Sequence, residues 1–165
     1  MLLVFAVCLI PVHIWLIVTF LGQARGIAMR LTTWDFVGAV AYVLSFALLE
    51  SVLLFLAIMV LAFILPGRMF RSKFVALSTV LVLVASAWFI YLHFNDEMID
   101  NRQITLLALW VFSFALALVG LSLLVHRSQR IENSLFALAG RLAVLAILYI
   151  FIDLLSVIVV VLRNV

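Results

Sequence analysis

Five long apolar segments, at about 2–22, 36–65, 74–94, 104–125 and 142–162, constrain this chain more than any other feature. A helix of roughly 20 residues, rising 1.5 Å per residue, crosses the ~30 Å hydrocarbon core of a bilayer. Four segments have that length, and the second is long enough to tilt, bend or project from the membrane. The sequence therefore predicts an all-α integral membrane protein, a single domain over residues 1–165 with about five transmembrane helices.

Composition supports the membrane class. The chain is 70% hydrophobic and 10% charged, whereas soluble domains are about 45–50% apolar and about 25% charged. The chain has ten Lys and Arg residues and seven Asp and Glu residues. The basic residues form short clusters at segment ends, where anionic headgroups attract them. The expected partner is thus the lipid bilayer, and nucleic acid is not expected.

The first segment is expected to be a retained helix. It has no basic region before it, stays apolar for about 21 residues, and lacks a convincing small-residue cleavage site, so it differs from a signal peptide. Thr32 and Asp35 have the spacing of a helix capping box at the start of the second segment. Pro66-Gly67 is typical of a helix stop at its end.

The loops predict the orientation. Four basic residues lie on the side opposite the N-terminus: Arg25, Arg30, Arg102 and Arg163. Six lie on the N-terminal side: Arg68, Arg71, Lys73, Arg127, Arg130 and Arg141. The positive-inside rule therefore predicts a cytoplasmic N-terminus and an external C-terminus. We expect a multi-pass protein of a bacterial-type cytoplasmic membrane.

Three ionisable residues lie near the middle of apolar segments: His13, Glu50 and Asp153. Their segment centres put them at one depth, within about 5 Å. Because a charge at the bilayer centre is costly, such residues face protein or water and have partners. Tyr149 and Ser156 share the helical stripe of Asp153, so the five residues form the candidate intramembrane polar cluster.

The cluster has three interpretations. It fixes helix packing through hydrogen bonds, it handles protons or cations through carboxyl and imidazole groups, or its carboxylates meet a helix of a partner protein. Equal depth alone does not distinguish them.

The sequence predicts no cofactor and no metal site. His13, His93 and His126 lie at different depths, which argues against two axial haem ligands, and the single Cys8 excludes zinc-type cysteine pairs. Motifs of metalloproteases, serine hydrolases and nucleotide-binding proteins are absent, so catalytic residues are not expected.

The order of segments resembles a known family. Ile10-Pro11-Val12 in the first span, a long second span, the basic stretch 68–73 and a third span ending at 91–96 look like the N-terminal five-helix region of bacterial sulfatase-like and lipoteichoic-acid-synthase-like membrane proteins. In that family a large extracellular domain carries the metal and nucleophile. The resemblance implies a membrane module without its enzyme, or a partner of one.

We therefore expect a non-enzymatic accessory, anchoring or assembly component of a membrane complex, which packs with another membrane protein or a second copy. The alternatives are a small proton- or cation-coupled transporter or channel that uses the polar cluster, and the membrane module of an envelope enzyme.

Overall fold

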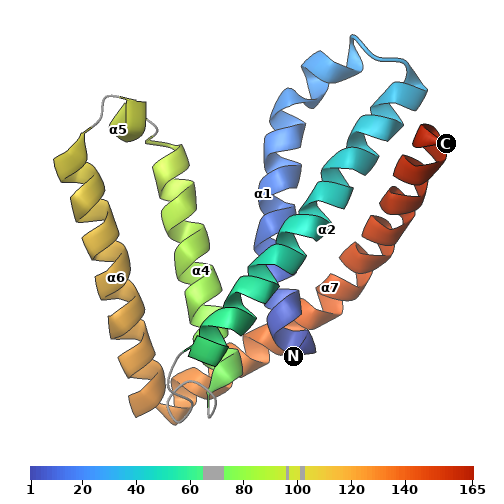
Figure 1. The fold of residues 1–165 in the computed structure, drawn as a ribbon. Helices are drawn as coiled ribbons and strands as arrows, with labels where there is room; N and C mark the ends of the chain where they lie inside the picture. Colours follow the sequence, from blue (N-terminus) through green and yellow to red (C-terminus); the bar gives the residue numbers. More distant parts are fainter. Residues whose placement is uncertain (65–72, 96, 101–102) are drawn as a thin grey trace. The chain divides into compact units, whose positions relative to one another are not determined.

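The computed structural model describes residues 1–64, 73–95, 97–100 and 103–165. Regular structure in these residues is helical (Figure 1) and comprises α1 Leu2–Ala28, α2 Thr33–Ile64, α4 Phe74–His93, α5 Glu97–Asp100, α6 Ile104–Arg127 and α7 Gln129–Asn164. Five of these, all except the short α5, are long and apolar enough to cross a membrane. The prediction of an all-α protein with five transmembrane-length helices is confirmed.

Two helices, α1 and α7, extend by more than a turn beyond their apolar segments. α1 continues beyond residue 22 to Ala28, and α7 begins at Gln129, thirteen residues before the expected span. Hydropathy detects only the part of a helix that lies in hydrocarbon, so polar helical extensions escape it. The predicted stop at Pro66-Gly67 and the basic residues Arg68, Arg71 and Arg102 lie outside the described residues.

The chain divides into two compact units, and unit 1 comprises Met1–Leu61 with Gly140–Val165. Here α1 packs against α7 through a buried cluster of Ala6, Leu9, Ile10 and Ala146. Aromatic contacts join α1 to α2, namely Phe5 with Phe55 and Phe20 with Phe36 at centroid separations of 5.7 and 5.9 Å. Unit 1 is therefore a three-helix assembly built from both ends of the chain.

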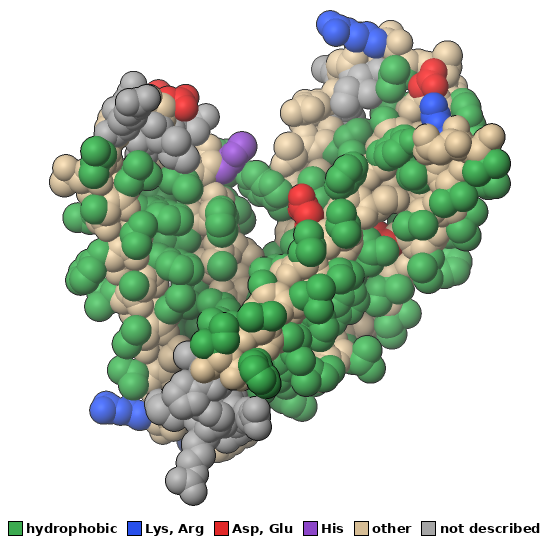
Figure 2. Space-filling model, in the orientation of Figure 1, with side chains coloured by type: hydrophobic (Ala, Val, Ile, Leu, Met, Phe, Trp, Pro, Cys, Tyr) green, Lys and Arg blue, Asp and Glu red, His purple; other side chains and the backbone are tan. Residues whose placement is uncertain are grey.

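Unit 2 comprises Ala62–Ala139. Its core lies between α4, α6 and the first turns of α7, with the buried residues Ala76, Leu77, Val80, Val84 and Val125. Hydrophobic side chains cover much of the visible helix surfaces of the protein, and the visible Lys and Arg side chains lie at helix ends (Figure 2). This distribution fits helices whose outer faces contact lipid.

Candidate functional site

His13 of α1 and Asp153 of α7 form a hydrogen-bonded pair inside unit 1. The Nε2 and Oδ1 atoms are 2.9 Å apart, and both side chains are 0% exposed. The two residues are separated by 140 positions in the sequence. The pair therefore joins the first and last long helices at a point that neither water nor lipid reaches.

The second ring nitrogen of His13 determines the hydrogen placement. Nδ1 lies 2.9 Å from the carbonyl oxygen of Leu9, one turn earlier in α1. Since a carbonyl only accepts, Nδ1 must carry a hydrogen and donate it. One proton then lies between Nε2 and Oδ1, bound either to the imidazole or to the carboxyl group. In both arrangements the pair has zero net charge, which suits a buried position in a membrane helix.

The other two members of the expected cluster on α7 are Tyr149 and Ser156. The ring of Tyr149, one turn before Asp153, lies 5.0 Å from the His13 ring with an interplanar angle of 52°. Ser156 is buried, but its hydroxyl donates to the carbonyl of Ile152 within α7 at 2.9 Å. Tyr149 thus contacts the pair, whereas the Ser156 hydroxyl is used within its own helix.

The second carboxyl oxygen of Asp153 is buried and has no hydrogen-bond partner among the described residues. An unpaired oxygen of this kind is far less costly on a neutral carboxylic acid than on a carboxylate. The geometry therefore favours the arrangement in which Asp153 carries the shared proton. Its carboxyl O–H then donates a hydrogen bond to Nε2 of the neutral imidazole.

Glu50 does not join this pair. It lies near the middle of α2 with an exposed side chain, and within the described part of the chain no hydrogen bond or ion pair reaches its carboxylate. The buried side of α2 carries Ala47, Ser51 and Ile58. Of the three ionisable residues expected at one depth, the structure brings two together and places the third on another face.

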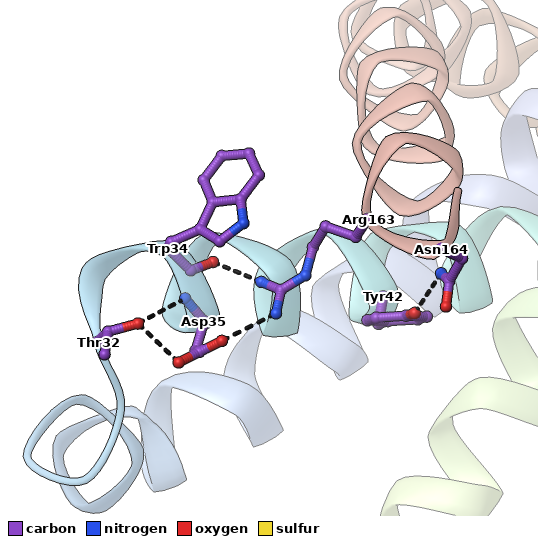
Figure 3. A network of polar contacts seen from close by, with 6 residues as sticks. All are labelled: Thr32, Trp34, Asp35, Tyr42, Arg163 and Asn164. Carbon is purple, nitrogen blue, oxygen red and sulfur yellow. Dashed lines mark hydrogen bonds and ion pairs between the residues drawn. The ribbon is translucent and has the colours of Figure 1, made fainter.

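A second polar network joins the start of α2 to the end of α7 (Figure 3). Arg163 donates from Nη2 to Asp35 at 2.9 Å and from Nη1 to the carbonyl of Trp34, and its guanidinium lies 5.7 Å from the Trp34 ring centroid. Asn164 donates to the Tyr42 hydroxyl at 2.6 Å. We call this set the α2–α7 clamp.

One half of the expected capping box is part of the clamp, namely the bond to the Thr32 hydroxyl. The Asp35 backbone N–H donates to the Thr32 hydroxyl at 3.2 Å, and that hydroxyl donates to the Asp35 carboxylate at 2.6 Å. Gly38 lies beneath the Arg163 guanidinium, at a place where any Cβ would overlap it. Sequence reasoning found the cap but missed the ion pair. The available signal was that Asp35 directly precedes the second span and Arg163 directly follows the fifth, on the same side of the membrane.

Unit 2 has its own polar contacts. Lys73 forms a 2.6 Å ion pair with Glu132 and donates to the Val125 carbonyl at 2.9 Å, so it connects α4 with the junction of α6 and α7. The Trp88 indole donates to Ser113 at 3.1 Å beside an open groove of about 370 Å³ between α4 and α6. The Trp88 and Trp110 indoles and the Ser113 hydroxyl are hydrogen-bonded there, so the groove offers mainly apolar surface.

Within the described residues, no three His, Cys, Asp or Glu side chains come together as metal ligands would. Comparisons with protein-family models, curated proteins and solved structures found no match. The fold therefore defines the class, a polytopic membrane protein with five transmembrane-length helices.

Proposed function

We propose that this chain is a non-enzymatic accessory or assembly component of a membrane complex in a bacterial-type cytoplasmic membrane, with its N-terminus inside and its two units acting as one membrane domain. The observation that supports this role is the sealed His13–Asp153 pair. A transport site needs alternating access to water, whereas this pair is 0% exposed and both imidazole nitrogens are engaged. Its geometry is that of a link between helices.

Extraction in a mild detergent followed by native mass spectrometry tests the proposal. We expect a stable complex with another membrane protein, identified by peptide sequencing. Free monomer as the sole species would contradict the accessory role. In parallel, the purified chain in vesicles containing a pH-sensitive dye is expected to give no proton flux above that of empty vesicles.

A proton-coupled transporter is the second candidate, because one buried oxygen of Asp153, beside the shared proton, has no partner in the part of the chain that the structure describes. Proton flux in wild-type vesicles that disappears in Asp153→Asn would favour this candidate over the accessory role. The amide retains hydrogen-bonding capacity but cannot release a proton at ordinary pH.

The third candidate is a membrane module of a sulfatase-like envelope enzyme. It rests on the order of spans and on Ile10-Pro11-Val12 in α1. Identification of a sulfatase-like enzyme as the co-purifying protein would favour it.

A further inference from the structure

Glu50 lies in an apolar surface on the exposed side of α2. Phe46 and Leu53, about one turn to either side, are 58% and 56% exposed. Lipid chains cover such hydrocarbon side chains without penalty, but they provide no donor for a carboxyl group. We call the exposed positions Phe46, Leu49, Glu50 and Leu53 the Glu50 face.

Within the described residues, the middle parts of the long helices offer Glu50 no free charge complement. Arg141 of α7 lies directly before the apolar segment 142–162, where the headgroups begin. α4 and α6 carry Lys, Arg or His only in their last turns. His13 is bonded to Asp153, and Arg163 is bonded to Asp35 at the end of the helix pair.

A second copy of this chain would also lack a basic residue that could pair with Glu50. It would bring another Glu50, and two carboxylates at one depth repel unless one is neutralised. Charge complementarity thus favours a different protein over self-association.

We propose that the Glu50 face binds a transmembrane helix of a partner protein that carries Lys, Arg or His near mid-membrane. The inference rests on the proposed accessory role and specifies the partner's chemistry. In the complex the basic group donates to the Glu50 carboxylate, and the apolar residues around it pack against the partner helix. Ionisable residues inside membranes pair in this way, because both groups leave water together.

A designed helix tests the chemistry directly. The full chain is reconstituted in phosphatidylcholine vesicles with a fluorescent Leu-rich transmembrane peptide that has a single central Lys, and energy transfer reports association. We expect the Lys peptide to bind about 3-fold to 20-fold more tightly than the same peptide with a central Leu, the range given by measured interhelical hydrogen bonds.

Variants of the chain test whether Glu50 causes the tighter binding of the Lys peptide. Glu50→Leu is expected to remove the preference for Lys, and Glu50→Lys to transfer it to a peptide with a central Glu. Leu154→Ala is the matched control, since Leu154 is 55% exposed in the middle part of α7, beside Asp153, and is expected to change nothing. Equal binding of the Lys and Leu peptides, or a Lys preference that survives Glu50→Leu, would overturn the proposal.

A photoreactive amino acid at Leu53 tests for the natural partner in native membranes, with the same group at Leu154 as the control. A crosslink from position 53 to a helix of another protein with a mid-membrane basic residue supports the proposal. Crosslinks only to lipid, to this chain or to a second copy overturn it. If native mass spectrometry finds a partner that Leu53 never reaches, the accessory role stands and the Glu50 face is wrong.

Discussion

At the scale of single residues, the His13–Asp153 pair shows how a membrane helix accommodates ionisable groups. The Leu9 carbonyl holds Nδ1 as a donor, so Nε2 and Asp153 share one proton as a neutral unit. Replacement of only one residue of such a buried pair lowers stability, because it leaves the other polar group buried and unsatisfied.

Substitutions of Asp153 separate hydrogen bonding from charge. Asp153→Asn is expected to retain most of the stability, since its amide N–H donates to Nε2 of neutral His13. Asp153→Leu is expected to cost about 1–3 kcal/mol, because Nε2 becomes a buried acceptor without a donor. Reversible unfolding in mixed detergent micelles measures both, with Ser156→Ala as a neighbouring control. Equal destabilisation by Asn and Leu would show that an ion pair, and not the shared hydrogen bond, links the helices.

A double replacement tests the coupling of the same two residues. His13→Leu alone is expected to destabilise by about 1–3 kcal/mol, since it leaves the neutral Asp153 carboxyl group buried without a partner for its proton. His13→Leu with Asp153→Leu is expected to be more stable than His13→Leu alone, because apolar pairs often replace buried polar pairs at little cost. Additive losses in the unfolding assay would exclude direct coupling.

The sequence could predict the depth of these residues but not their contact. His13, Glu50 and Asp153 all lie near span centres, yet only two of them meet. Which pair forms depends on the face that α2 buries, and small residues such as Ala47 and Ser51 decide this by allowing close packing. α2 itself carries apolar residues on all of its sides, so helical periodicity gave little indication of which face is buried.

At the scale of helices, the α2–α7 clamp depends on the absence of a side chain at Gly38, because the Arg163 guanidinium occupies that space. Gly38 leaves space for Arg163, which reaches the Trp34 carbonyl and Asp35 in the first turn of α2. Asp35 at a helix N-terminus also interacts favourably with the helix dipole. The clamp thus fixes the end of α7 to the start of α2.

The effect of Gly38→Ala on the free energy of unfolding is expected to depend on whether Arg163 is present. In the wild-type chain, the methyl group of Gly38→Ala displaces Arg163, and loss of this partly exposed ion pair offsets the gain in helix propensity. In an Arg163→Ala background, Gly38→Ala should stabilise by about 0.8–1 kcal/mol.

Unfolding of the wild type, the two single variants and the double variant measures this. Gly120→Ala is a control that stabilises in both backgrounds, because no described atom outside its own helix backbone lies within 4 Å of its Cβ position. Identical effects of Gly38→Ala in the two backgrounds would contradict the clamp.

Lys73 is expected to hold the junction of α6 and α7 in unit 2. Lys73→Met removes the donor to the Val125 carbonyl and the ion pair with Glu132, so amide hydrogen exchange at residues 128–132 should accelerate. Arg127→Met is the matched control, since this neighbouring cation is exposed and makes no such contact among the described residues. Unchanged exchange in Lys73→Met would assign the stability of the junction to apolar packing alone.

At the scale of the whole molecule, hydropathy was sufficient for the class and for the five long helices, because the length of an apolar run reflects bilayer thickness. It did not predict the composition of unit 1, which joins residues 1–61 with 140–165. That pairing depends on side-chain contacts between distant segments, such as Ala6 and Leu9 with Ala146.

The predicted orientation can be tested with cysteine accessibility. Val165→Cys, at a fully exposed position, is expected to react with an impermeant maleimide in intact cells, whereas Asn133→Cys should react only after permeabilisation. Cys8 is buried and gives a low background. Reaction of Asn133→Cys and protection of Val165→Cys in intact cells would reverse the topology.

The link between α1 and α7 also has a consequence for biosynthesis. At about 5–20 residues per second, a ribosome needs about 7–28 s to add the 140 residues that separate His13 from Asp153. Throughout that interval the imidazole of His13 is in the nascent chain without its final acceptor or donor. Unit 1 is therefore completed only after unit 2 has been synthesised, and a chain that stops before α7 carries a histidine without its partner.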